Sequence, residues 1–325
     1  GMDRVGARGI GESIWLAWFA TSVMNAFAEI CEARSDQSRA TSWRRRARSL
    51  QQSAQREGWD GEWYLRAFDD DGLPWGSKDS EECRIDSISQ SWAILAGAAP
   101  SDRADLALSA VDRNLVRDEE KLVRLLWPPF DATRRDPGYI KSYPPGMREN
   151  GGQYTHAATW LAWAFAKRGK GDRAAEIFRC INPIYHAVTR EDAMRYAVEP
   201  YAVAADICSA PPHTGRGGWT WYTGAAAWAW RVGVEAILGI ARVGDVLEID
   251  PRIPGDWAEC RALMRFSGGT LEIRIENPDG CGSGVREILV DGQKLSEARV
   301  EIPADGGEHT AVVRLGPPTE SEDQA

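Results

Sequence analysis

The sequence is short of the residues that build metal and redox centres. Only four of its 325 residues are histidines, and its six cysteines are scattered without a close pair. Structural zinc sites need Cys and His at short, regular spacing, so this sequence predicts none. Because no disulfide framework is evident, we expect reduced thiols in a cytoplasmic protein that holds no metal and no organic cofactor.

Two further absences narrow the partners. The formal net charge is −9, so the chain lacks the basic excess that binds a nucleic-acid backbone. No stretch of about 18 apolar residues is free of charge, which predicts that the chain has no membrane span. Arg4 and Arg8 are followed by neither a clean apolar run nor a small-residue cleavage site, so we expect no signal peptide.

Tryptophan, by contrast, is abundant, with 15 residues. Its broad apolar face and single N–H donor suit stacking on the C–H face of a sugar ring. Tryptophans embedded in predicted helices fit a core equally well. Those that lie among glycines and polar residues are better candidates for ligand contact: Trp59, Trp63, Trp75, Trp219 and Trp221.

Up to about residue 240, apolar residues recur at helical spacing. The predicted helices cover residues 12–34, 38–57, 86–97, 101–116, 152–167, 171–181, 191–208 and 223–238. Three loops, at 59–83, 127–152 and 211–222, are long and rich in aromatic residues or in proline and glycine, which is unusual for simple connections. We therefore predict a mainly α domain over residues 1–240 that presents substrate loops at one end.

From about residue 241 the pattern changes to a period of two. Leu271, Ile273 and Ile275 alternate with charged residues, which is typical of a strand with one buried face. Turn signals follow at residues 277–280, 291–292 and 305–307. These features predict a small antiparallel β domain over residues 241–325, ending in a polar C-terminal tail.

The densest cluster of polar side chains lies at residues 143–156. Gly151 and Gly152 allow the backbone to approach a ligand closely. His156 follows at a predicted helix start, where free N–H groups favour an anion, so we interpret it as functional rather than structural. The side chains here that can bind a substrate by hydrogen bonds are Arg148, Glu149, Asn150, Gln153 and Tyr154.

A second cluster, at residues 213–224, combines glycines with Trp219 and Trp221. It ends at a predicted helix start, with Thr223 as N-cap and Gly224 after it. Glycines, a hydroxyl and free helical N–H groups can cradle an oxyanion.

A third cluster begins at Trp59 and Asp60 and runs to residue 72. Carboxylates beside aromatic residues fit the recognition of sugar hydroxyls, although residues 70–72 equally fit a plain turn. The acidic residues lack the regular spacing of a calcium loop, so no metal is expected.

Taken together, these segments resemble glycoside hydrolase family 94, the inverting disaccharide and oligosaccharide phosphorylases, and in particular the C-terminal region of cyclic β-1,2-glucan synthases. The motifs lie at residues 1–6, 11–15, 58–64, 82–92, 148–156, 199–201 and 215–224. The resemblance covers residues 1 to about 280. It implies part of an (α/α) six-hairpin barrel, its later half or more, followed by a small β domain.

The resemblance also implies reversible phosphorolysis of a β-glucan or oligosaccharide. One carboxylic acid protonates the glycosidic oxygen, while inorganic phosphate, as co-substrate, attacks the anomeric carbon in place of an activated water. His156, Thr223 and Gly224 would bind phosphate, and Glu149 with its neighbours would bind sugar hydroxyls.

The sequence departs from the family pattern at its start. The family's general acid is the last Asp of an Asp-Trp-Asn-Asp motif directly before the segment that matches residues 1–6, and Asp3 stands here for a usual Asn. We therefore expect the acid upstream of Gly1, assign no catalytic residue, and expect the chain alone to be inactive. A homodimer, or complementation by the missing half of the barrel, is the expected assembly. Full-length relatives are expected at the inner membrane.

Two other functions remain open. The chain can be a non-catalytic carbohydrate-binding protein that keeps the loop surface. It can also be a glucoamylase-like inverting hydrolase that uses Glu149 and Glu199 as acid and base. Phosphate dependence separates a phosphorylase from a hydrolase, and sugar binding without turnover indicates the binding protein.

Overall fold

The computed structural model describes residues 1–317, which form two compact units. Unit 1 comprises Gly1–Ala164 and Ile177–Ala229, and unit 2 comprises Phe165–Glu176 and the chain from Trp230 onward. Most of the predicted polar tail falls on residues 318–325, outside the described residues. The domain boundary placed at residue 240 stays a prediction.

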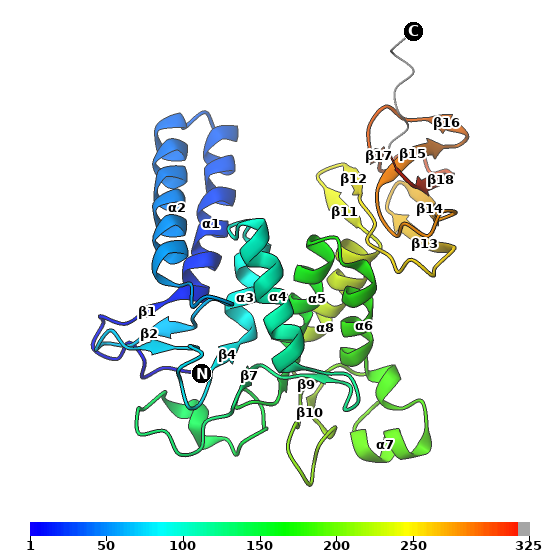
Figure 1. Cartoon of the computed structure of the whole chain (residues 1–325). Coiled ribbons are helices and arrows are strands. Elements are labelled where there is room, and N and C mark those ends of the chain that lie inside the picture. Colours follow the sequence, from blue (N-terminus) through cyan, green and yellow to red (C-terminus); the bar gives the residue numbers. More distant parts are fainter. Residues whose placement is uncertain (318–325) are drawn as a thin grey trace. The chain divides into compact units, whose positions relative to one another are not determined.

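Each of the eight segments predicted to be helical contains a helix (Figure 1). Apolar periodicity located these helices because each presents one face to a core. Their bounds are α1 Ile14–Ala33, α2 Gln37–Glu57, α3 Ser87–Leu95, α4 Ser101–Leu115, α5 Thr155–Lys167, α6 Gly171–Ile181, α7 Arg190–Tyr196 and α8 Ala225–Arg231, which continues as a π-helix, Val232–Ile237.

Helices α1 and α2 form an antiparallel hairpin (Figure 1). Ala40, Ala47 and Ala54 recur every seven residues along α2 and are buried. Such a repeat keeps small side chains on one side of a helix, so the backbones of α1 and α2 can approach closely. At the far end of the hairpin, Trp43 packs on the buried Ala28 and Cys31.

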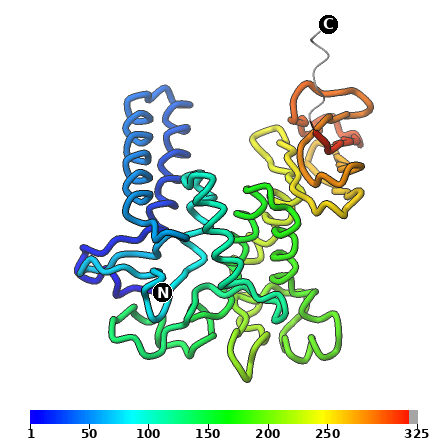
Figure 2. The backbone as a smooth tube through the Cα atoms, in the orientation of Figure 1, coloured from blue at the N-terminus to red at the C-terminus, as the bar shows by residue number. Residues whose placement is uncertain are grey.

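The prediction of a helix over residues 191–208 was wrong in its second half. Helix α7 ends at Tyr196 because Ala197 adopts a left-handed conformation, with φ of 56°. The chain then forms strand β9 (Ala204–Ile207), which lies between β8 (Gln153–Tyr154) and β10 (Gly217–Thr220). This small sheet joins the segments around residues 148–156 and 213–224. Figure 2 shows the long loops of unit 1 gathered at one end of its helices.

Short two-residue strands tie the remaining loops of unit 1 together. They pair as β1–β2–β3, β4–β7 and β5–β6. Their bounds are β1 Glu12–Ser13, β2 Ala67–Phe68, β3 Pro74–Trp75, β4 Ile85–Asp86, β5 Val116–Arg117, β6 Leu122–Val123 and β7 Leu126–Trp127.

Unit 2 contains two sheets. The first is antiparallel, with β11 (Ile240–Val243), β12 (Val246–Ile249) and β17 (Arg299–Glu301). The second has the order β13-β14-β18-β15-β16, with bounds Glu259–Phe266, Gly269–Glu276, Glu308–Leu315, Val285–Val290 and Gln293–Lys294. It is mixed rather than antiparallel as predicted, because β14 and β18 pair in parallel. The chain between them, which holds β15 to β17, is long enough for the crossover that a parallel pair requires.

Helix α1 corrects one expectation about membranes. By length and composition it is apolar enough to cross a membrane, and it is the one such helix within residues 1–317. The sequence criterion missed it because it demanded a run free of charge, whereas α1 contains Glu29 and Glu32. One face of α1 is packed on protein, with Trp18, Thr21 and Ala28 buried.

Candidate functional site

The segment before α1 is held by the carboxylate of Asp70. This group accepts hydrogen bonds from the backbone N–H groups of Arg8 (2.7 Å), Ile10 (2.9 Å) and Gly11 (2.8 Å). These bonds lower the pKa of the Asp70 carboxyl, so it stays ionised. Residues 70–72 were considered as a plain turn or a substrate contact; the structure shows that Asp70 fixes a neighbouring loop.

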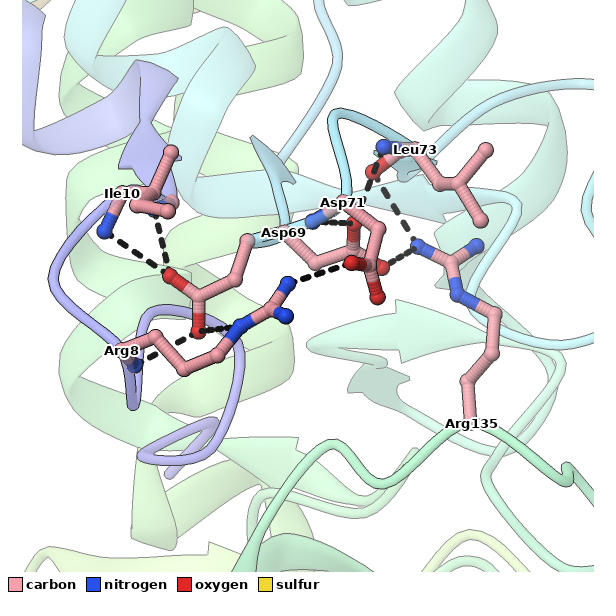
Figure 3. Close-up of polar contacts among 8 residues, drawn as sticks. Arg8, Ile10, Asp69, Asp71, Leu73 and Arg135 are labelled. Atoms are coloured by element: carbon pink, nitrogen blue, oxygen red, sulfur yellow. Dashed lines mark hydrogen bonds and ion pairs between the residues drawn. The ribbon is translucent and has the colours of Figure 1, made fainter.

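Two further contacts attach the proline-rich loop 128–152 to the same region. The Arg135 guanidinium donates to Asp69 at 2.6 Å and lies 4.0 Å from the ring of the buried Trp75 (Figure 3 shows the Asp69 contact). The Asp3 carboxylate accepts the N–H of Tyr139 at 2.9 Å. That hydrogen bond lowers the pKa of Asp3, so Asp3 is a poor proton donor at neutral pH.

Arg148 and Glu149 lie near the end of this loop and form an ion pair without a hydrogen bond. The Nε atom of Arg148 is 3.8 Å from Oε2 of Glu149, too far for a hydrogen bond. Both atoms are buried, and neither has a hydrogen-bond partner. The guanidinium lies over the rings of Trp219 (4.4 Å) and Tyr143 (5.4 Å). Arg148 also has a positive φ of 48°, a strained conformation that is common at functional sites.

Asn150 and Gln153 are placed differently, since both are fully buried. The Asn150 amide bonds to the backbone N–H and C=O of Phe130 and to the C=O of Tyr143. The Gln153 amide bonds to the N–H of Val123 and to the hydroxyl of Thr155. These two amides are therefore buried and hold the backbone around them.

His156 lies in the first turn of α5, as the sequence predicted. Its Nε2 atom is buried without a hydrogen-bond partner. The ring packs against Trp160 (4.5 Å between ring centres) and Trp228 (5.9 Å). Burial lowers the pKa of His156, so the imidazole is neutral at pH 7 and can donate one N–H.

The Thr223–Gly224 corner leads into the helix that carries Trp228. The Thr223 hydroxyl accepts the N–H of Ala225 at 3.0 Å, which is the predicted capping contact. The Gly224 carbonyl accepts the N–H of Trp228 at 3.4 Å. Because Trp228 touches His156, the structure brings the beginnings of α5 and α8 into one neighbourhood.

Four aromatic side chains near this region are exposed. They are Trp219 (55% exposed), Trp221 (71%), Tyr201 (74%) and Tyr222 (75%). Trp219 packs edge-on against Tyr222, and Trp221 packs against Tyr201. Large exposed aromatic groups mark binding surfaces more often than they serve folding.

Glu199 orients this aromatic cluster. Its carboxylate accepts hydrogen bonds from the Thr220 hydroxyl (2.6 Å) and from the indole N–H of Trp221 (3.2 Å). The bond from Thr220 makes the largest contribution to lowering the pKa of Glu199. Glu199 is therefore ionised, and its carboxylate already accepts hydrogen bonds from Thr220 and Trp221.

Trp59 and Asp60 have partners inside the protein. Trp59 packs on Tyr64 (4.9 Å), and the Arg103 guanidinium lies 4.9 Å from its ring. The Asp60 carboxylate accepts the hydroxyl of Ser77 and the N–H of Lys78. Their contacts shape the loop after α2. Across residues 1–317 no group of three His, Cys, Asp or Glu side chains is arranged to hold a metal.

One residue of the site was missed by sequence reasoning. Asp206 lies on β9 opposite Tyr154 of β8 and Gly218 of β10. It is 6% exposed, and burial raises its pKa, with Arg148 acting in the opposite direction. The available signal was a single carboxylate in the apolar run 202–208, but that run was assigned to a helix.

Comparison with known proteins places the chain among carbohydrate-active enzymes. The family model "Glycosyl hydrolase 94 superfamily, catalytic domain" matches residues 3–239. The chain is 48% identical over 288 residues to the cyclic beta-(1,2)-glucan synthase NdvB of Rhizobium meliloti (strain 1021), an alignment that covers 89% of this chain and 10% of that protein.

Phosphorylases are similar over nearly the whole chain. Solabiose phosphorylase of Paenibacillus borealis is 31% identical over 316 residues (97% of this chain, 40% of that protein). N,N'-diacetylchitobiose phosphorylase of Vibrio furnissii is 30% identical over 312 residues (95% and 38%). The chain therefore spans between a tenth and two fifths of the length of these relatives.

Solved structures are similar in fold. A sialidase superposes with a TM-score of 0.55 at 14% identity, covering 87% of this chain and 25% of that one. A family GH78 rhamnosidase of Bacillus sp. GL1 gives a TM-score of 0.50 at 14% identity, covering 94% and 28%.

Proposed function

Because the chain belongs to the glycosyl hydrolase 94 superfamily, we propose that its loop surface binds a β-linked gluco-oligosaccharide beside inorganic phosphate, as part of an inverting β-1,2-glucan phosphorylase. The observation that carries this proposal is a set of three buried atoms without hydrogen-bond partners: Arg148 Nε, Glu149 Oε2 and His156 Nε2. Buried polar atoms are nearly always hydrogen-bonded in folded proteins. A sugar with several hydroxyl groups, bound beside phosphate, supplies both the hydrogen-bond donors and the acceptors that these atoms need.

In this proposal, phosphate binds between His156 and the Thr223–Gly224 corner. A neutral imidazole donates one N–H to a phosphate oxygen, and the backbone N–H groups before α8 donate others. Support comes from Trp228, which contacts His156 and follows Gly224 by one turn. Phosphate is a co-substrate here, and no organic cofactor is required.

The sugar binds over the exposed aromatic groups. Trp219 and Trp221 offer their faces to the pyranose rings, while Arg148, Glu149 and Tyr154 form hydrogen bonds with the hydroxyls. Asn150 and Gln153 act indirectly, since their amides hold the loop beneath the ligand. Trp59 and Asp60 shape the neighbouring loop.

We propose that residues 1–325 alone release little or no glucose 1-phosphate. Phosphorolysis needs a carboxylic acid that donates a proton to the glycosidic oxygen. The lowered pKa values of Asp3 and Glu199 make both poor donors, because both already accept hydrogen bonds. The same observation argues against a hydrolase in which Glu199 changes its protonation state, and leaves a carbohydrate-binding protein as the second candidate.

Three broader proposals accompany this function. The helices of unit 1 form part of an (α/α) six-hairpin barrel, consistent with their paired arrangement in sequence. The protein acts in the cytoplasm, where its six cysteines stay free, as they are in this structure. It works with a further protein chain, either a second copy or a complementing part of the barrel.

The test is a pair of measurements on the whole chain. Calorimetry with a β-1,2-linked gluco-oligosaccharide should show binding that strengthens in the presence of phosphate, whereas a β-1,4-linked oligosaccharide of equal length should bind less well. Enzymatic assay of the same mixture should detect no more than traces of glucose 1-phosphate.

Trp219→Ala should weaken sugar binding, because the sugar loses its stacking face. Trp257→Ala is the matched control, since Trp257 is also partly exposed (42%) but lies in unit 2. Absence of any sugar binding would refute the proposed function, and rapid release of glucose 1-phosphate would refute the inactivity of the chain.

A further inference from the structure

The Asp206 carboxylate is an unusual group in the core of the small β8-β9-β10 sheet. All four residues of β9 are buried, and Asp206 is the charged one. The influences on its pKa are burial, Arg148 and Glu149, and no hydrogen bond to the carboxylate is found among residues 1–317. Asp206 is 6% exposed, yet its oxygens are not among the fully buried atoms without a partner in residues 1–317, so the carboxylate is open to solvent on one side.

The carboxylate stays uncovered because its neighbour is a glycine. Gly218 pairs with Asp206 in the sheet, and a Cβ atom at Gly218 would lie 3.0 and 3.1 Å from the two carboxylate oxygens. Gly218 has no positive φ, so its backbone conformation does not require glycine. We attribute the glycine at this position to packing, because any larger residue would fill the space above the Asp206 carboxylate.

Three charged groups therefore share this region. Arg148 and Glu149 interact electrostatically with Asp206, and Tyr154 lies beside it in the sheet. One cation and two carboxylates leave an excess of negative charge. A neutral sugar can donate hydroxyl hydrogens to such acceptors, whereas a sugar acid would bring a third carboxylate.

We propose that Asp206 determines specificity in this site, by accepting hydrogen bonds from hydroxyl groups of a neutral sugar and repelling acidic sugars. The proposal rests on the proposed function and adds the substrate class. Discrimination of this kind needs a repulsive element as well as an attractive one. A relative named as a solabiose phosphorylase and two named as phosphorylases of a glucuronide and of cellobionic acid show that neutral and acidic sugars both occur among the relatives.

The test compares a neutral β-1,2-linked glucose disaccharide with the aldonic acid made from it. The wild-type chain should bind the neutral sugar at least about tenfold more tightly. Asp206→Asn should reduce the ratio of the two affinities by about tenfold, because it removes one negative charge while keeping the shape of the side chain. Asp131→Asn, the same change at an exposed residue near the start of the loop 128–152, should leave the preference unchanged.

Gly218→Ala is a second variant that keeps every charge. Its methyl group should cover the Asp206 carboxylate and weaken binding of the neutral sugar, with an unchanged melting temperature. If the wild type binds neither sugar, the proposed function itself fails. If it binds the neutral sugar but Asp206→Asn keeps the same preference, only the role of Asp206 is refuted.

A different observation concerns the surface of α1. Five large apolar side chains of this helix are exposed: Leu16 (50%), Phe19 (37%), Val23 (50%), Phe27 (41%) and Ile30 (55%). At 3.6 residues per turn they fall within an arc of about 80°. This apolar stripe lies opposite the buried face of α1 that contains Trp18, Thr21 and Ala28. Phe19 and Phe27 also touch Trp92 and Trp43 with part of their rings. Contiguous exposed apolar patches mark interaction sites for a protein or a membrane.

The stripe is symmetric in sequence about Val23. Leu16 and Ile30 each lie seven residues from it, and Phe19 and Phe27 each lie four. Beyond the stripe, Glu12 and Arg34 each lie eleven residues away, and both are exposed. When two copies of α1 pair antiparallel about Val23, like positions match. Glu12 of β1, two residues before α1, then lies at the end of the pair where Arg34 of the other copy follows its helix.

We infer that α1 is the dimer interface of this chain, formed by a second copy that packs antiparallel across Val23. A two-fold interface places the same patch on both copies, so its sequence must be self-complementary. The symmetric stripe meets this condition because like apolar side chains face each other across the axis. Glu12 and Arg34 meet it because they carry opposite charges.

Sedimentation velocity tests this inference. The wild type should be a dimer at micromolar concentration, and Val23→Glu should be a monomer with an unchanged circular dichroism spectrum, because it places two like charges on the two-fold axis. Leu106→Glu, at a residue 48% exposed on α4, is the matched control and should remain dimeric.

Charge exchange tests the register. Glu12→Arg and Arg34→Glu should each weaken the dimer, and the double variant should restore it. A monomeric wild type, or a dimer that tolerates Val23→Glu, refutes the interface. A double variant no tighter than the single ones refutes the antiparallel register.

Discussion

The Nε atom of Arg66 lies 3.1 Å from Oδ2 of Asp86, and both side chains are largely buried, at 14% and 3% exposed. The same guanidinium donates to the Ser13 hydroxyl at 3.1 Å. Ser13 caps α1 and Asp86 caps α3, so one cation joins the starts of two helices. Unit 1 depends on this link because it holds loop residues and helix ends together.

Replacement of Asp86 by Ala should therefore destabilise the chain strongly. It leaves the largely buried Arg66 charge without its carboxylate, which costs about 3–5 kcal/mol, and it removes the cap of α3. Urea unfolding followed by circular dichroism measures the change. Glu62→Ala breaks the exposed Arg113–Glu62 pair and should have little effect. Equal effects of the two substitutions would contradict the importance of burial.

Asn150→Ala should lower stability rather than act only on ligand binding. The variant leaves the two buried backbone groups of Phe130 and the part-buried carbonyl of Tyr143 without the amide, and each buried unsatisfied group costs about 1–3 kcal/mol. A melting curve of the free protein measures this loss. A variant with normal melting but weak sugar binding would show that Asn150 contacts the ligand directly.

Anion binding should depend on the protonation of His156. Burial lowers its pKa below the usual value, so the folded protein takes up fewer protons than the unfolded chain and loses stability as the pH falls below about 6.5. Sulfate, whose charge stays constant in this range, should bind more tightly and restore stability as the pH falls.

Tryptophan fluorescence can follow sulfate binding, because the His156 ring touches Trp160 and Trp228. His156→Gln should remove the pH dependence of binding. If His156→Gln keeps the wild type's pH dependence of sulfate affinity between pH 5 and pH 8, His156 is excluded from the anion site.

In unit 2, His309 should stabilise the sheet at neutral and mildly acidic pH. Its ring lies 2.6 Å from Asp291 and 3.0 Å from Asp305, and these contacts raise its pKa. The resulting stability is fully present below the unfolded pKa of about 6.5 and is lost as the pH rises through the folded pKa. At the acidic end, it is lost as the two carboxylates, whose pKa values are lowered, become protonated.

The measurement for His309 is the melting temperature from pH 3 to pH 9 for the wild type and for His309→Gln. The difference between the two proteins should be greatest at mildly acidic pH and should shrink at both ends. A difference that is constant with pH would indicate a packing role without charge.

The sequence by itself located the helices, because each helix is stabilised by contacts between residues three and four positions apart. Helices α1 and α2 lie within two residues of the ranges predicted for them, and the Thr223 hydroxyl makes its predicted cap. His156 was likewise placed at a helix start from local signals. Family membership also followed from motifs along the chain.

Only the tertiary structure decided which polar residues of these motifs are buried in the core. Asn150 and Gln153 belong to the same motif as Arg148 and Glu149, yet distant backbone groups at Phe130 and Val123 bury their amides. Strand β9 replaced a predicted helix because β8 and β10 supply its hydrogen bonds, and the parallel pairing of β14 with β18 joins residues far apart in the chain. Burial and strand pairing depend on partners remote in sequence, which local patterns do not record.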